Sequence, residues 1–155
     1  MARDTVNAQG FGLIELLVVL VIAGLLLTLA VPAYNGYTER ARVARAIGEI
    51  GAISLAIDRY RLHNDDQLPM ALNQLQYDVT NDPSGRPYVY LNIPAAGLGA
   101  GGLRKDGKLN PLNTDFDLFS VGRDGAYAGP LSAKKSEDDV VRANNGAFIG
   151  LGRDY

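Results

Sequence analysis

The chain has 155 residues, a formal net charge of −2 at neutral pH, one histidine and no cysteine. A nearly neutral chain gives no electrostatic reason to expect nucleic acid as a partner. The absence of cysteine excludes a disulfide framework and a thiolate metal site. Once an apolar N-terminal segment is set aside, the remainder has the size of one domain.

An apolar run follows the first ten residues and contains one carboxylate near its start. The run covers residues 11–33, and as a helix it would be roughly 34 Å long, enough to cross the ~30 Å core of a bilayer. Glu15 would be costly in hydrocarbon without a positive partner. A new α-amino group at Phe11 would be such a partner. A secretory signal peptide would be shorter, and a plain membrane anchor leaves Glu15 unexplained.

The start of the chain resembles the class III leader and N-terminal helix of the type IV pilin and pseudopilin superfamily in Gly10-Phe11-Gly12-Leu13-Ile14-Glu15, Pro32 and Tyr34. In that superfamily a prepilin peptidase cuts after the glycine, the new terminal Phe is N-methylated, and the Glu meets a neighbouring subunit's N-terminus. The resemblance implies a leader of residues 1–10, processing between Gly10 and Phe11, and assembly through Phe11 and Glu15. Gly12 departs from the usual Thr or Ser, and no basic pair precedes Gly10.

The arginines on either side of the apolar run bear on its orientation across a membrane. Arg40, Arg42 and Arg45 follow the run, whereas only Arg3 precedes it, next to Asp4. The positive-inside rule alone would therefore place the leader outside the cytoplasm. The resemblance implies the opposite orientation, because the prepilin peptidase acts on the cytoplasmic side.

Beyond Tyr34, apolar residues recur at steps of three and four, which predicts an amphipathic helix continuing from the apolar run. The residues are Val43, Ile47, Ile50, Ile53, Ile57 and Tyr60. Pro32 removes one helical hydrogen bond, so a kink or local melting is expected near it. Asn64-Asp65-Asp66 ends the helix, and residues 70–75 are expected to form a short helical turn.

Two later runs predict strands, at residues 88–92 after a dense turn sequence and at residues 116–121, where apolar and polar residues alternate. Loops are expected at 95–102 and 105–113. Gly97, Gly99 and Gly102 match a dinucleotide fingerprint, but a turn sequence follows instead of a helix. We therefore expect an α+β, pilin-like fold, with the long N-terminal α-helix packed against a small antiparallel β-sheet and residues 34–155 forming one globular domain.

Three segments narrow the resemblance to the major, G-type pseudopilin of type II secretion systems: DPSGRPYVYLN at 82–92, FDLFSVGRDG at 116–125 and EDDV at 137–140. In that family these parts clasp one calcium ion. The resemblance implies Asp124, Asp138 and Asp139 as metal ligands. Ser84 departs from a frequent Trp, and the loop 126–136 and the tail 142–155 are longer than usual.

Calcium also has a physical rationale, because it binds six to eight oxygens from carboxylates and backbone carbonyls. Carbonyls between Phe119 and Gly122 would supply part of the remaining ligands. The alternative is a solvated acidic loop facing Lys134 and Lys135.

No catalytic constellation is apparent, since the only histidine, His63, lies at the end of the long helix without a nucleophile motif nearby. The resemblance implies a structural subunit, not an enzyme. It would be held as a single-pass protein in the bacterial inner membrane and then polymerised into a periplasmic filament that drives protein secretion. Implied partners are further copies of the chain, minor pseudopilins, the prepilin peptidase and the inner-membrane secretion platform. The alternatives are a type IV pilin of a surface fibre and a membrane-anchored, calcium-dependent binding module that never polymerises.

Overall fold

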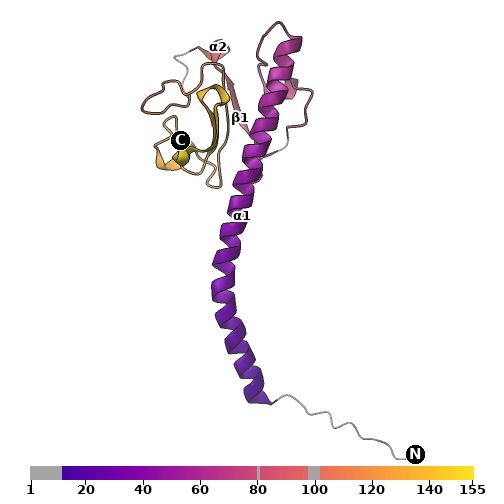
Figure 1. The fold of residues 1–155 in the computed structure, drawn as a ribbon, viewed down its shortest axis with the longest axis vertical. Coiled ribbons are helices and arrows are strands. Elements are labelled where there is room, and N and C mark those ends of the chain that lie inside the picture. Colours follow the sequence, from indigo (N-terminus) through magenta and orange to yellow (C-terminus); the bar gives the residue numbers. More distant parts are fainter. Residues whose placement is uncertain (1–11, 80, 98–101) are drawn as a thin grey trace, which may run out of the picture. The chain divides into compact units, whose positions relative to one another are not determined.

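The computed structural model describes residues 12–79, 81–97 and 102–155 and contains one long helix, a four-stranded sheet and several short helical turns. In chain order the elements are α1 (Leu13–His63), η1 (Leu72–Gln74), β1 (Val89–Asn92), α2 (Ile93–Ala96), β2 (Phe116–Ser120), η2 (Lys134–Ser136), β3 (Val140–Ala143), η3 (Asn144–Gly146), β4 (Phe148–Leu151) and η4 (Gly152–Asp154) (Figure 1). The expected α+β fold class is confirmed.

The chain divides into two compact units, one ending at Glu39 and the other running from Arg40 to Tyr155, so α1 contributes to both. The sequence had suggested a boundary at the end of the apolar run, after Ala33. Helix α1 continues through Pro32 and Gly36, and the expected local melting is wrong. A proline removes only one hydrogen bond of the ladder, and the flanking turns keep theirs.

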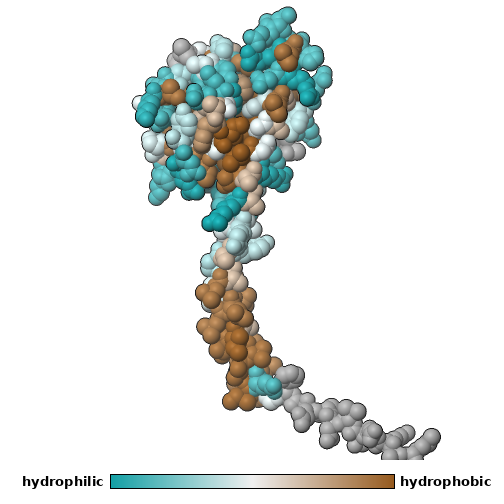
Figure 2. All heavy atoms as spheres, viewed as in Figure 1, coloured by the Kyte–Doolittle hydropathy of each residue, from teal (hydrophilic) through white to brown (hydrophobic). Residues whose placement is uncertain are grey.

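In the first unit, α1 exposes large apolar side chains on all sides, from Leu13 (79% exposed) to Val31 (54% exposed). Figure 2 shows this part of the helix as an almost continuous hydrophobic surface. By length and composition, α1 is able to cross a membrane. A helix that is apolar all round needs lipid or other protein around it.

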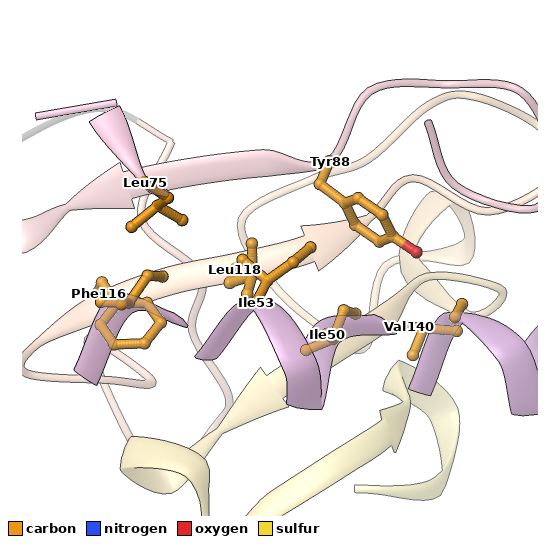
Figure 3. Packing of buried hydrophobic residues seen from close by; sticks show 9 residues of the cluster. Ile50, Ile53, Leu75, Tyr88, Phe116, Leu118 and Val140 are labelled. Atoms are coloured by element: carbon orange, nitrogen blue, oxygen red, sulfur yellow. The ribbon is translucent and has the colours of Figure 1, made fainter. Parts of the chain in front are cut away.

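In the second unit, α1 is amphipathic, as its sequence period predicted. Ala46, Ile50, Ile53 and Ile57 are buried at steps of three and four, whereas Leu55 is 70% exposed. In Figure 3, Ile50 and Ile53 lie against Phe116 and Leu118 of β2. This apolar stripe fixes which side of the helix faces the sheet.

The sheet is antiparallel throughout, in the order β1-β2-β3-β4. Val89 pairs with Phe119 and Asn92 with Phe116, so the two expected strands are confirmed as neighbours. Strands β3 and β4 lie in segments where the sequence had indicated only an acidic pair and a tail. That tail is therefore part of the sheet.

Strand β2 is buried along its whole length, including Asp117 and Ser120. The alternation of apolar and polar residues in this strand therefore does not correspond to one buried and one solvated face. Phe116 and Leu118 belong to the core beside α1, while Phe119 packs in a second core with Leu112, Leu131 and Val141. Loops cover the second face, which carries Asp117, so this carboxylate lies in the protein interior.

Candidate functional site: the acidic turn after strand β2

The acidic turn begins directly after β2, where Gly122 adopts a positive φ of 61°. A side chain at Gly122 would collide with Asp138, since a Cβ there would lie 2.6 Å from both the Asp138 carbonyl and its Oδ2. The Asp138 carboxylate accepts hydrogen bonds from the amides of Arg123 (2.9 Å) and Asp124 (3.2 Å). The turn and the acidic pair, which are separate segments of the sequence, are thus in direct contact.

The turn is also connected to the Asp-Pro segment before β1. Asp82 caps its own turn by accepting from the amides of Ser84 (2.9 Å) and Arg86 (2.8 Å), and its other carboxylate oxygen accepts from the Ser120 hydroxyl at the end of β2. Arg86 donates to the carbonyl of Arg123 at 3.2 Å. The two motifs singled out in the sequence therefore lie side by side.

The three predicted metal ligands have different environments. Asp124 is exposed and accepts from the Ala126 amide at 2.8 Å, and Asp138 is half-buried. Asp139 is fully buried, and its Oδ2 accepts a hydrogen bond of 2.8 Å from Nη2 of Arg104. The structure brings the three aspartates into one neighbourhood. It also gives Asp139 a partner that was not predicted from the sequence.

Among the three aspartates, Asp139 has a clearly shifted pKa. Burial raises the pKa of its carboxyl to about 6, Arg104 opposes this shift, and the charges of Asp138 and Asp124 add to it. Asp139 is therefore ionised at neutral pH and paired with Arg104. Its Oδ1 is buried and has no hydrogen-bond partner among the residues that the structure describes.

The oxygen atoms near the acidic turn can be compared with those that a calcium ion binds. Within the described ranges, no three His, Cys, Asp or Glu side chains form a group that could hold a metal ion as they stand. However, an unpartnered buried oxygen of Asp139 close to two further carboxylates is a donor set of the kind calcium uses. The residue types fit the ion.

A second buried polar cluster joins the loop before β2 to the C-terminal tail. Arg142 on β3 forms two hydrogen bonds with the Asp115 carboxylate (2.6 and 2.9 Å) and lies over the Phe116 ring. Asn113 donates to Asp117 and accepts from the amide of Asn145. None of these contacts was predicted from the sequence. The only signal was that charged residues alternate with apolar ones through 115–118.

The N-terminal candidate residues lie at the edge of the described chain. Gly10 and Phe11 are outside the described residues. Glu15 lies in the first turn of α1, where its amide donates to the Gly12 carbonyl at 3.0 Å. Its carboxylate is exposed among apolar neighbours and has no ion-pair partner within the described residues. The Glu15 carboxylate is thus accessible to another molecule, as pairing with a neighbouring subunit would require.

Comparison with known proteins gives both local and full-length matches. Residues 6–31 match the prokaryotic N-terminal methylation motif. The chain is 33% identical over 143 residues to type II secretion system core protein G of Escherichia coli strain K12, covering 90% of this chain and 93% of that protein. The Klebsiella pneumoniae protein of the same name is 32% identical over 136 residues, or 85% and 91% of the two chains.

Fimbrial protein Q of Moraxella bovis is also similar, with 44% identity over 153 residues that cover 96% of this chain and 82% of that protein. No solved structure matches significantly. A methylation motif at the head of a long apolar helix, followed by a four-stranded antiparallel sheet, defines a type IV pilin-like protein. Given its full-length similarity to the Escherichia coli protein, the chain belongs to the family of type II secretion system core protein G.

Gly122 provides a test of the turn geometry. We expect Gly122→Ala to lower the free energy of unfolding by about 2 kcal/mol or more, because a positive φ and a steric clash both act against the new methyl group. Gly107→Ala is the matched control, since a Cβ added at Gly107 would have no atom within 4 Å and its φ is not positive. The free energy of unfolding of each variant is measured by urea unfolding of the full-length chain in detergent, monitored by tyrosine circular dichroism. Equal losses in the two variants would contradict the described turn.

Proposed function

We propose that this chain is the structural subunit of a type II secretion pseudopilus. The single observation that carries the proposal is its similarity to core protein G over nearly the full length of both chains. In this proposal a prepilin peptidase removes residues 1–10 and Phe11 becomes N-methylated. Residues 11–33 hold the protein in the inner membrane until it is polymerised into a periplasmic filament.

The exposed surface of α1 supports polymerisation on physical grounds. Large apolar side chains from Leu13 to Val31 cannot remain in water, since exposing them costs about 25 cal/mol per Å². Lipid covers these apolar side chains before assembly, and the helices of neighbouring subunits bury them in a filament. One segment thus serves both as membrane anchor and as filament core.

Glu15 supplies the specific contact in this proposal. Its carboxylate pairs with the N-terminal amine of Phe11 on an adjacent subunit, and the pairing selects one axial position among many equivalent apolar ones. Opposite charges about 4 Å apart attract by about 4 kcal/mol at an effective dielectric constant of 20. Apolar packing alone provides no such preference.

A surface fibre is the second candidate, because a fimbrial protein shares 44% identity over 153 residues with this chain. Both candidates use the same cleavage and the same helix packing. They differ in location and partners. A pseudopilus subunit works with minor pseudopilins and the inner-membrane secretion platform, whereas a surface pilin is displayed outside the cell.

We further propose that Asp124, Asp138 and Asp139 hold one structural calcium ion. The unpartnered, buried Oδ1 of Asp139 and the two carboxylates beside it support this proposal. When bound, the ion would neutralise these charges and cross-link the turn after β2 to the segment before β3. The chain has no disulfide to provide such a link.

Cleavage can be tested at the proposed processing site. We expect Gly10→Val to leave an uncut precursor in the membrane, because the peptidase requires a small residue at the cleaved bond, whereas Gly10→Ala is cut. Mass spectrometry of the purified protein measures the N-terminus. A natural chain that begins elsewhere than at Phe11 would contradict the processing assignment.

Glu15→Gln tests assembly and function together in the native bacterium. We expect normal cleavage and membrane insertion but few or no filaments, because the neutral amide loses the attraction to the Phe11 amine. Electron microscopy counts the filaments, and fractionation locates the exported proteins. Retention of exported proteins in the periplasm supports the pseudopilus, and loss of surface fibres with export intact supports the second candidate. Filaments of normal number and length would disprove the proposed pairing.

Calcium removal tests the metal site in the full-length chain in detergent. We expect chelator to lower the melting temperature, because an ion that binds only the folded state adds about 2.7 kcal/mol of stability at a hundredfold excess over its dissociation constant. Calcium restores the loss, and equimolar magnesium does not, since magnesium demands a tighter octahedral geometry. Asp124→Ala should abolish the response, while Asp106→Ala, in a separate turn, should retain it. Identical melting curves with and without chelator would assign the aspartates to a metal-free acidic loop.

A further inference from the structure

Arg104 is a charged side chain in the interior of the second unit, with 1% of its surface exposed. It lies in the connection between α2 and β2, close to segments that the sequence predicted to be loops. Burying a guanidinium without partners would be very unfavourable. Its contacts therefore indicate what the folded protein gains from placing it there.

The guanidinium of Arg104 joins three segments that are distant in sequence. Nη2 donates to Asp139 Oδ2 at 2.8 Å and Nη1 to the carbonyl of Ala128 at 2.9 Å, while the planar group lies 4.4 Å from the centre of the Phe119 ring. Its backbone amide donates to Asp117 Oδ2 at 2.8 Å. The residue thus connects β2, the start of the long loop after the acidic turn, and the acidic pair before β3.

These partners are of the two kinds that calcium also binds, a carboxylate oxygen and a backbone carbonyl oxygen. Two properties distinguish the arginine from a metal ion. It is part of the chain and cannot be removed by a chelator, and its fixed fork of donors matches a carboxylate in one geometry. Burial lowers the pKa of Arg104 from its ordinary value, and the nearby Asp139 opposes the shift. An arginine guanidinium stays protonated in proteins, so the pair with Asp139 is an ion pair.

We infer that Arg104 is a built-in cation of the acidic turn, which neutralises Asp139 from inside the domain and limits how strongly the fold depends on calcium. It positions the Asp139 carboxylate by holding Oδ2, while Oδ1 has no hydrogen-bond partner among the described residues. The inference rests on the calcium proposal only for the effect on metal dependence. The pairing with Asp139 is independent of any metal.

The experiment compares melting temperatures of the full-length chain in detergent, with calcium and with chelator, for the natural chain and Arg104→Met. Removing one partner of a buried pair should lower the melting temperature in chelator by about 10 °C. Calcium can then compensate the charge of Asp139 in place of Arg104. The difference between calcium and chelator should therefore be at least about twice that of the natural chain. Arg153→Met, which removes an exposed arginine, is the control and should change neither value.

A double variant keeps the test decisive if Arg104→Met alone does not fold. Arg104→Met with Asp139→Asn removes both charges, and we expect it to regain part of the stability lost in chelator, as paired residues do in a double-mutant cycle. A double variant as unstable as the single one overturns the inference. An equal calcium response in the natural chain and in Arg104→Met also overturns it, while leaving the calcium proposal intact. If calcium raises the melting temperature of neither the natural chain nor Arg104→Met, the calcium proposal fails. The role of Arg104 is then decided by whether the double variant regains stability.

Discussion

The burial of strand β2 on both faces is the constraint on which the rest of the second unit depends. One face meets the isoleucine stripe of α1, which is ordinary packing of a helix on a sheet. The other face is covered by loops, and loops bring backbone polar groups and charged side chains with them. Each buried polar group then needs a partner, because leaving one unsatisfied costs about 1–3 kcal/mol.

The polar clusters of this protein meet that requirement at most of their atoms, with Asp139 Oδ1 and Arg104 Nε as exceptions. Asp117, in the middle of β2, accepts hydrogen bonds from the amide of Arg104 and from Asn113. Arg104 and Arg142 both stack on phenylalanine rings of the same strand while pairing with carboxylates. The loops are thus held to the sheet by specific hydrogen bonds in a chain that has no cysteine.

Helix α1 meets two different requirements along its length. Its first part is apolar all round, as lipid or neighbouring helices demand, and its second part carries a single stripe that its own sheet covers. The change in pattern occurs within one uninterrupted helix. In the proposed function, this lets the same element serve as anchor, filament core and scaffold of the globular domain without a hinge loop between them.

The sequence by itself determined the features that depend on local pattern. Apolar length predicted a helix able to span a membrane, and steps of three and four predicted which residues of α1 are buried. The first two strands were evident from their aromatic and β-branched residues. The resemblance around Glu15 indicated the pilin and pseudopilin superfamily, three later segments indicated the G-type family, and the comparisons confirmed both.

Only the tertiary structure decided how the interior is built. Strands β3 and β4 are four residues each, too short for a clear period, and are stabilised by neighbours far away in sequence. The partner of Asp139 could not be inferred, because Arg104 is 35 residues away in a glycine-rich segment and reaches it only once the chain has folded. Charge pairing depends on distance in space, and local sequence pattern carries no information about that distance.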